Sequence, residues 1–189
     1  FVKLKCSLMP YLYRQAKRSH EEGVPMMRPM FVEFPEDRAC EPLDRQYMLG
    51  DSLLVAPVFK ESGEVEYYLP EGKWINLLTG KAVEGGRWQK ETHDYFSLPL
   101  MVRPNAILAV GNDDTRPDYD YADGVKLCLS NFEDGAEAVA EIPGLNGKIV
   151  MTVHAKRTGD VIAIVTEGRN RNFSCEVLGD QEVRVEYKE

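Results

Sequence analysis

The sequence lacks a long hydrophobic run and an excess of positive charge. No uninterrupted apolar stretch approaches the ~18 residues of a membrane helix. The densest one, Leu53 to Phe59, has only the length of a strand. The formal net charge of -8 argues against a nucleic-acid partner, because phosphate binding needs a basic surface. We therefore expect neither a membrane nor a nucleic acid among the partners of this chain.

Clustered cysteines are missing as well. Cys6, Cys40, Cys128 and Cys175 are far apart and form no C-x-x-C pair. A zinc site needs clustered ligands, and a disulfide scaffold needs more cysteines in a smaller chain. The three histidines are scattered without metal spacing. We expect four reduced, mostly buried thiols in a cytoplasmic protein that holds no metal and no cofactor.

The composition that remains is that of a soluble globular protein. Hydrophobic residues make up 43% and charged residues 29% of 189 positions, which allows one large domain or two small ones. The first ten residues, FVKLKCSLMP, lack an initiator methionine and show no signal-peptide pattern, because polar residues interrupt the apolar ones. We expect that they lie inside a helix and that the chain is a fragment.

A helix followed by a strand is predicted near the N-terminal end. One apolar stripe recurs every four residues, at Leu4, Leu8, Leu12 and Ala16, and Gly23 is the predicted C-cap. Pro10 either kinks this helix or starts a second one after Ser7. The segment GVPMMRPMFVEFPED, residues 23 to 37, then predicts a buried strand from Met26 to Phe34, as in a parallel sheet covered on both faces.

From Gly50 onward the hydrophobic period changes to two. Val65, Tyr67 and Leu69 alternate with Glu64, Glu66 and Tyr68, and further strands are predicted over 53–59, 95–102 and 107–110. A short helix could form over 44–49. Six more strands are predicted near 125–130, 137–142, 148–154, 161–166, 173–178 and 182–187, with turns at Asn146-Gly147 and Thr158-Gly159-Asp160. Strands this closely spaced, without helices between them, indicate an antiparallel sandwich.

Several motifs in the order of the chain resemble the C-terminal part of glycoside hydrolase family 31. They are LMPYLY with RPMFVEFPED, QYMLGDSLLVAPV, YYLPEGKWINLLTG and SLPLMVRPNAILAVG. The segment NDDTRPDYDYADG, with HAKRTGD further on, is most similar to the bacterial α-xylosidases of the family. The resemblance covers residues 4 to 167.

Members of this family are retaining α-glycosidases with a (β/α)8 barrel followed by a proximal and a distal C-terminal β-domain. The resemblance implies a mainly β fold in three parts. Residues 1–43 would be the last helix–strand unit of the barrel, residues 44–114 the proximal domain and residues 115–189 the distal domain. The implied substrate of the full-length parent is an oligosaccharide with terminal α-linked xylose.

No residue of this chain matches a catalytic, substrate-binding or metal-binding residue of the family. Retaining hydrolysis needs two carboxylates ~5–5.5 Å apart, and in the family both are aspartates on earlier barrel strands. The resemblance thus implies a fragment that is structural and inactive by itself. The alternative is a free-standing carbohydrate-binding or scaffold β-module.

Residues 1–43 would expose large apolar side chains without their barrel neighbours. We expect the helix to dock on the proximal domain or copies of the chain to associate, and we favour association into a homo-oligomer. Removing residues 1–43 should then make the protein more monomeric.

Three charged residues near the predicted strand are candidates for function. Glu33 and Asp37 would lie at the C-terminal end of the strand, the face on which barrel enzymes form their active sites. We interpret them instead as a salt-bridge residue and a turn residue. Arg28 is interpreted as a structural ion-pairing group, because a guanidinium in an apolar segment needs a carboxylate or carbonyl partner.

An acidic segment and a group of aromatic residues each allow a binding function and a structural role. Asp118, Asp120 and Asp123 precede Gly124 but miss the spacing of a calcium loop, so we predict an acidic interdomain linker. Aromatic residues concentrate in the proximal part and could form a sugar-stacking surface. We favour core packing for them, because large aromatics dominate β-sandwich cores. They are Tyr67, Tyr68, Trp74, Trp88, Tyr95 and Phe96.

Overall fold

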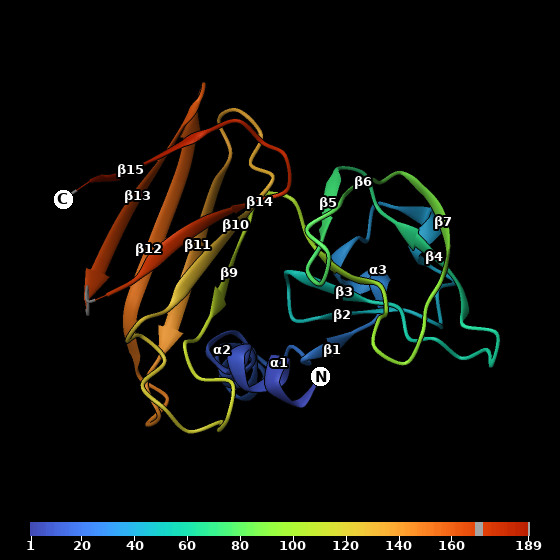
Figure 1. Cartoon of the computed structure of the whole chain (residues 1–189), viewed down its shortest axis with the longest axis horizontal. Coiled ribbons are helices and arrows are strands. Elements are labelled where there is room, and N and C mark those ends of the chain that lie inside the picture. The colour runs from blue at the N-terminus through green and yellow to red at the C-terminus, as the bar shows by residue number, and fades with distance from the viewer. Residues whose placement is uncertain (169–171, 189) are drawn as a thin grey trace. The chain divides into compact units, whose positions relative to one another are not determined.

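The computed structural model describes residues 1–168 and 172–188, and the chain forms two compact units (Figure 1). Unit 1 comprises Phe1–Val24 and Asn105–Glu189, and unit 2 is Pro25–Pro104. Unit 2 is therefore inserted between the two segments of unit 1. The compact units have their borders after residues 24 and 104, whereas the sequence predicted domain borders after residues 43 and 114.

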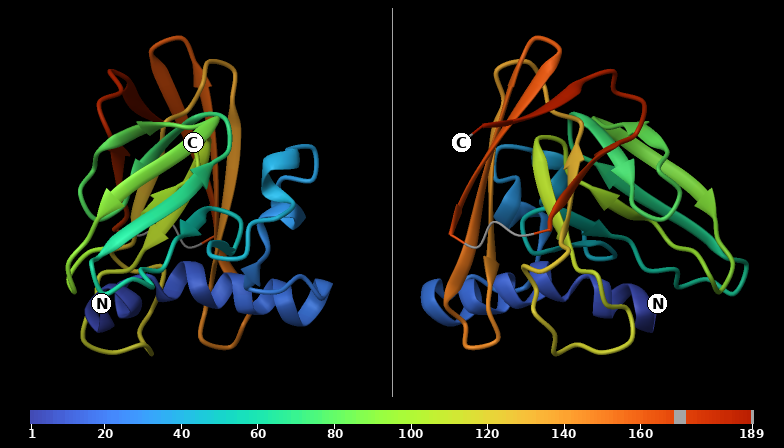
Figure 2. Two further views of the ribbon diagram at one scale, coloured as in Figure 1. Left: turned by 90° about the vertical axis from the view of Figure 1, so that its right-hand side faces the viewer. Right: turned by 60° about the vertical axis from the view of Figure 1, so that its left-hand side comes forward.

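Unit 1 begins with two helices, α1 (Val2–Ser7) and α2 (Met9–Glu22). Pro10 lies in the first turn of α2, where a missing N–H costs nothing. Gly23 ends α2 in the left-handed conformation, at φ +74°, and its N–H donates to the Ser19 carbonyl. The predicted helix is confirmed in the form of two helices that meet after Ser7. Figure 2 shows them running one after the other beside the strands of unit 1.

Two sheets form the rest of unit 1. The three-stranded sheet has the order β14-β10-β9, and the four-stranded sheet has the order β11-β12-β13-β15. Their bounds are β9 (Ala106–Val110), β10 (Lys126–Ser130), β11 (Glu137–Pro143), β12 (Ile149–Thr158), β13 (Val161–Gly168), β14 (Ser174–Leu178) and β15 (Arg184–Lys188). The six strands predicted beyond residue 124 are thus confirmed, with small shifts at their ends.

Two strand pairs of unit 1 are parallel, which corrects the prediction of a purely antiparallel sandwich. β10 pairs with β14 and β13 pairs with β15 in parallel. The chain adds β13 to the four-stranded sheet, crosses to the other sheet as β14 and returns as β15. A strand that returns by such a crossover can run in the direction of its neighbour, which a tight hairpin does not allow.

One hydrophobic core joins both sheets of unit 1. Side chains of β9, β10, β11, β12 and β13 contribute to it, and Met9 and Tyr13 of α2 pack against it. α2 contacts β9 and β11. The helix therefore packs on the strands of its own unit: β9 lies within residues 44–114, the expected proximal domain, and β11 lies within residues 115–189, the expected distal domain.

Unit 2 contains a six-stranded sheet of the order β1-β2-β3-β8-β5-β6 and a separate two-stranded sheet of β4 and β7. Its elements are β1 (Met27–Arg28), α3 (Met30–Glu33), the 3-10 helix η1 (Arg38–Cys40), β2 (Tyr47–Leu49), β3 (Leu53–Val55), β4 (Glu64–Leu69), β5 (Lys73–Asn76), β6 (Ala82–Glu84), β7 (Arg87–Thr92) and β8 (Leu100–Val102). The predicted strand around Val65 to Leu69 is confirmed as β4.

The strand predicted from Met26 to Phe34 is wrong over most of its length. Only Met27–Arg28 is a strand, and it pairs antiparallel with β2. Pro29 then begins α3, because proline has no N–H with which to continue the ladder. Phe31 and Val32 are 48% and 44% exposed, so the segment is not covered on both faces. No parallel barrel strand is formed by these residues.

Three shorter elements also differ from expectation. β2 occupies part of residues 44–49, where a short helix was considered. β3 ends at Val55, two residues before Pro57, although the apolar run continues to Phe59. β8 begins only at Leu100. No helix within the described residues is long and apolar enough to cross a membrane.

Candidate functional site

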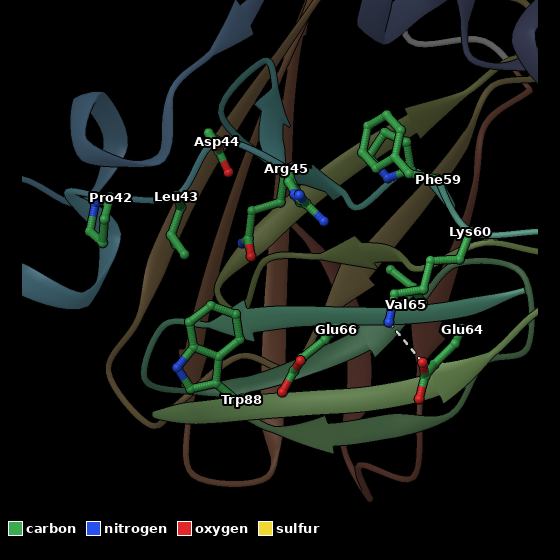
Figure 3. Close-up of a pocket in the computed structure, with 12 residues that line it drawn as sticks. Pro42, Leu43, Asp44, Arg45, Phe59, Lys60, Glu64, Val65, Glu66 and Trp88 are labelled. Carbon is green, nitrogen blue, oxygen red and sulfur yellow. Dashed lines mark hydrogen bonds and ion pairs between the residues drawn. The ribbon is translucent and has the colours of Figure 1, made fainter.

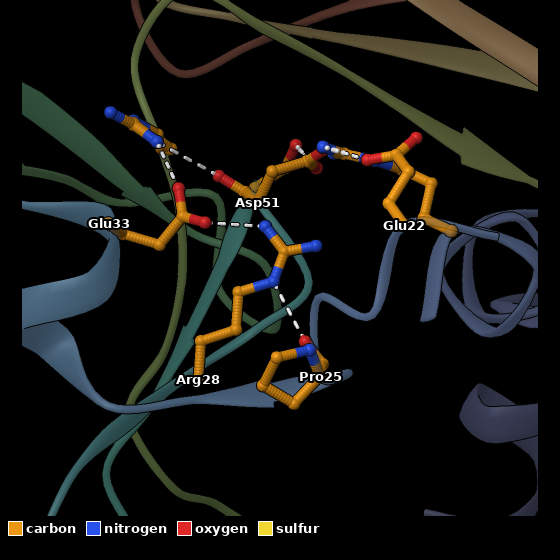
Figure 4. Close-up of polar contacts among 8 residues, drawn as sticks. Glu22, Pro25, Arg28, Glu33 and Asp51 are labelled. Carbon is orange, nitrogen blue, oxygen red and sulfur yellow. Dashed lines mark hydrogen bonds and ion pairs between the residues drawn. The ribbon is translucent and has the colours of Figure 1, made fainter. Parts of the chain in front are cut away.

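A largely buried carboxylate in unit 2 lies between two arginines (Figure 4). Glu33 Oε1 accepts a hydrogen bond from Arg28 Nη1, and Glu33 Oε2 accepts one from Arg103 Nη1 at 3.0 Å. Arg28 Nε also donates to the Pro25 carbonyl at 2.9 Å, and Arg103 Nη1 to the Asp51 carbonyl at 3.3 Å. The Arg28 side chain is 2% exposed and that of Glu33 14%.

This network confirms the structural interpretation of Arg28 and Glu33. Both oxygens of the Glu33 carboxylate are occupied by guanidinium groups, so a substrate would have to displace a buried ion pair to reach them. Arg103 also stacks on the Phe34 ring, with 4.6 Å from its guanidinium carbon to the ring centroid. The group ties β1, α3 and the segment after β8 together.

Asp37 is a turn residue, as predicted, and it has a second role. Its Oδ1 accepts a hydrogen bond from the Ala39 N–H at 3.0 Å and so caps η1. Its Oδ2 accepts one from the Tyr68 hydroxyl at 3.0 Å. Burial and this hydrogen bond raise the pKa of Tyr68 to about 12. Asp37 therefore links the start of unit 2 to β4.

The six aromatic residues fall into two groups. Tyr67 and Trp74 are fully buried and Tyr68 is 8% exposed, so the core-packing interpretation is confirmed for these three. It is wrong for the other three, because Trp88, Tyr95 and Phe96 are 54%, 94% and 86% exposed.

A pocket of about 370 Å³ lies beside Trp88 in unit 2 (Figure 3). Four segments line it: the chain before β2, the loop after β3, the first half of β4 and the start of β7. The lining residues are Pro42, Leu43, Asp44, Arg45, Gln46, Pro57, Phe59, Lys60, Glu64, Val65, Glu66 and Trp88. Figure 3 shows Trp88 and Phe59 on opposite sides of the pocket.

The walls of this pocket are held by specific contacts. Tyr68 and Trp88 are directly opposite each other in the β4–β7 ladder, and their ring centroids are 5.9 Å apart. The Gln46 amide fixes β4 to the chain before β2, because it donates to the Tyr68 carbonyl and accepts from the Tyr68 N–H, both at 2.7 Å. The pocket therefore has ordered walls.

Glu64 forms an ion pair with Lys60 at 2.8 Å and another with Lys90. The hydrogen bond from Lys60, followed by that from Lys90, lowers the pKa of Glu64 to about 2. Glu64 is thus ionised at neutral pH and its charge is already matched. It cannot donate a proton to a ligand in the pocket.

Sequence reasoning gave no sign of this pocket. No strand was predicted over 87–92, so no register could place Trp88 opposite Tyr68. The exposure of Tyr95 and Phe96 could have been inferred from the sequence, because Asp94 before them favours a surface turn. Asp94 accepts from the Phe96 N–H and from the Ser97 hydroxyl, each at 2.9 Å, and such Asx turns are a recognised use of aspartate.

The acidic segment after β9 is not a linker between compact units. It lies within unit 1, between β9 and β10, and Tyr121 and Ala122 are each 2% exposed in the core of that unit. Asp113 accepts from the Thr115 hydroxyl, and Asp118 pairs with Arg116 at 3.1 Å. The predicted turns are present, but the segment also packs.

The thiols match their prediction. All four cysteines are free, with Cys6, Cys40 and Cys128 buried and Cys175 partly buried. Burial raises the pKa of Cys40 and of Cys128 to about 11, so both are protonated and unreactive at neutral pH. Within residues 1–168 and 172–188, no group of three or more histidine, cysteine, aspartate or glutamate side chains could hold a metal ion.

Two family models match the chain. The glycosyl hydrolase family 31 C-terminal domain matches residues 23–108, and the C-terminal domain of the alpha-xylosidase YicI matches residues 120–188. The first match begins at residue 23, so the apolar segment that the sequence assigned to the barrel lies within this C-terminal domain.

The similar proteins are carbohydrate-processing enzymes. The chain is 41% identical to an alpha-xylosidase of Emericella nidulans and 36% identical to the alpha-xylosidase XylQ of Lactiplantibacillus pentosus; each alignment covers 87% of this chain and 22% of the relative. A glycoside hydrolase family 31 dextranase of Flavobacterium johnsoniae, solved with glucose, has a TM-score of 0.73 at 25% identity, covering 84% of this chain and 21% of that one. The chain thus spans about a fifth of the length of the relatives that it matches.

Proposed function

The chain belongs to glycoside hydrolase family 31, and from this premise we propose that it is the C-terminal part of a retaining α-glycosidase that removes terminal α-linked xylose from oligosaccharides. One observation carries the proposal. The alignments with two alpha-xylosidases run through both units and cover 87% of the chain. The division of the enzyme at residues 43 and 114 stays a prediction, as does association into a homo-oligomer.

We propose a structural role for the chain itself. Retaining hydrolysis needs a carboxylate nucleophile and a carboxyl group that donates a proton near neutral pH. Each carboxyl of the described residues whose pKa clearly shifts is lowered, namely Glu21, Glu64, Asp94, Asp113 and Glu137. Both oxygens of Glu33 are engaged by arginines. These observations support a chain that does not hydrolyse substrate alone, and we propose that it braces the catalytic part of the enzyme.

The proposed compartment is the cytoplasm. Four free cysteines, three of them buried, are compatible with a reducing environment.

A chimera tests the proposal. This chain replaces the matching segment of the alpha-xylosidase XylQ, and we expect the chimera to hydrolyse an aryl α-xyloside. The isolated chain should not turn over the same substrate. Turnover by the isolated chain that is lost in Glu33→Gln or Glu66→Gln would contradict the structural role, and a folded but inactive chimera would contradict the C-terminal assignment.

A free-standing carbohydrate-binding module is the second candidate, and the exposed Trp88 beside a pocket favours it. The two candidates differ in what precedes Phe1. The coding region upstream should contain a barrel with two catalytic aspartates if the chain is part of the enzyme, and should not if the chain is an independent module.

A further inference from the structure

We propose that the pocket beside Trp88 is a non-catalytic binding site for a short neutral oligosaccharide. The proposal rests on the proposed function only for the class of ligand, a neutral oligosaccharide. The geometry of the pocket carries the rest.

The first argument is an ordered aromatic surface. Trp88 is 54% exposed, although burial of an aromatic ring of this size would stabilise the folded protein. The position of the Trp88 ring is fixed by packing against Tyr68, with 5.9 Å between the two ring centroids. Tyr68 is itself fixed by Asp37 and by Gln46. The apolar C–H face of a pyranose ring can pack on such a preset indole ring at little cost in side-chain entropy.

The second argument is the presence of unengaged polar groups around this ring. Asp44 and Arg45 line the pocket, and neither forms a hydrogen bond or ion pair with another described residue. Glu66 is exposed on β4 next to them. Carboxylates accept and the guanidinium donates, whereas a sugar hydroxyl does both. The pocket therefore offers partners to adjacent hydroxyl groups.

The third argument is charge. The lining contains three carboxylates, of Asp44, Glu64 and Glu66, and two cations, of Arg45 and Lys60. Glu64 is additionally paired with Lys90 from outside the lining. The pocket thus has almost no net charge, and the whole chain carries -8. A phosphorylated or polyanionic ligand would gain nothing here, and the near balance of charges in the lining favours a neutral ligand.

The fourth argument is size and shape. About 370 Å³ lies within the range of ~300–1,000 Å³ that is typical of small-molecule sites. Phe59, which is 68% exposed, also lines the pocket and lies on the other side of it from Trp88 in the view of Figure 3. A ligand between them would contact an apolar ring at each end and polar groups along its length, which suits two or three linked sugar rings.

The test is a titration of the whole chain with isomaltotriose, followed by tryptophan fluorescence and by calorimetry. The chain has two tryptophans, and Trp74 is fully buried, so a change in emission reports on Trp88. We expect saturable binding that Trp88→Ala weakens by about tenfold, which corresponds to about 1.4 kcal/mol, because the variant loses the aromatic surface on which a sugar ring packs. Tyr95→Ala, an aromatic deletion outside the pocket, is the control and should leave the affinity unchanged. Glu66→Gln should weaken binding less than Trp88→Ala.

Each outcome decides the proposal. Absence of heat and of an emission change at millimolar isomaltotriose overturns it, and so does equal weakening by Trp88→Ala and Tyr95→Ala. Binding of a proline-rich peptide at Trp88 in place of the sugar overturns the ligand class. An unchanged emission of Trp74 in Trp88→Ala shows that the variant is folded. An inactive chimera together with sugar binding refutes the proposed function alone, whereas an active chimera without binding refutes this inference alone.

Discussion

Trp74 and Trp88 belong to the same unit but differ in burial, since Trp74 lies in the core and Trp88 is 54% exposed. Trp74 is fully buried in the core, and its Nε1 donates to the Pro70 carbonyl at 2.8 Å. We predict that Trp74→Ala lowers the free energy of unfolding by about 3–5 kcal/mol, because it leaves a large cavity. Trp88→Ala should cost less than about 1 kcal/mol. Urea unfolding of both variants measures this, and equal losses would contradict the assignment.

A second residue-scale prediction concerns the carboxylate between the two arginines. Glu33→Gln removes the negative charge that pairs with both Arg28 and Arg103, and loss of one partner of such a largely buried pair costs about 3–5 kcal/mol. We expect a clear drop in melting temperature. Glu36→Gln, at an exposed position three residues on, is the matched control. If both variants melt with the wild type, the network contributes no stability.

The sequence predicted part of this network. An arginine in an apolar segment must have a partner, so the ionic role of Arg28 could be inferred. Arg103, the second partner of Glu33, could not, because it is 70 residues away and only the folded sheet brings it near. The pocket could not be predicted for the same reason, because its walls come from four separate segments of the chain.

At the scale of elements, the β4–β7 pair should respond to pH through Glu64. Hydrogen bonds from Lys60 and Lys90 lower its pKa to about 2, from an ordinary value of 4.5. A carboxyl with a lowered pKa stabilises the fold above its unfolded value, and this stabilisation is lost as the pH falls through the folded value. We therefore predict that wild type melts above Glu64→Gln at pH 7 and that the difference vanishes near pH 2.

The measurement is the melting temperature of both proteins between pH 7 and pH 2. Added salt should reduce the difference at pH 7, because the ion pairs are exposed. A difference that does not vary with pH would show that Glu64 acts through packing and not through its charge.

Elements defined by local signals were predicted well. β12 and β13 follow from period-two alternation and from the turn at Gly159, which has a φ of +61°. The segment 26–34 was predicted wrongly as one strand, because a short apolar run does not distinguish a strand from a helix. Pro29 ends the strand after Arg28 and begins α3. The parallel pairs β10–β14 and β13–β15 depend on strands far apart in sequence, on which local patterns carry no information.

At the scale of the molecule, the two N-terminal helices contribute to the folded structure of unit 1. Leu8 and Tyr11 are buried at 4% and 5% exposure, and α2 contacts β9 and β11. Deleting residues 1–24 should therefore expose the core of unit 1, lower its stability and promote association. Unit 2 should stay folded, with the emission of Trp74 unchanged.

Size-exclusion chromatography with light scattering, together with fluorescence, checks this prediction. The sequence alone suggested that removal of the N-terminal residues would make the protein more monomeric. If the variant that lacks residues 1–24 is monomeric and as stable as the full chain, our prediction is contradicted and the expectation from the sequence is supported.

The insertion of unit 2 into unit 1 also sets an order of events on the ribosome. α2 is made before both of its strand partners: β9 begins at residue 106, and β11 begins only at residue 137. At ~5–20 residues per second, the helix waits on the order of ten seconds for this partner. All of unit 2 is made during that interval, because it lies between the two segments of unit 1. The amphipathic helix is meanwhile a nascent segment whose apolar stripe is not yet covered by β11, and a chaperone that recognises such stripes could bind it during this interval.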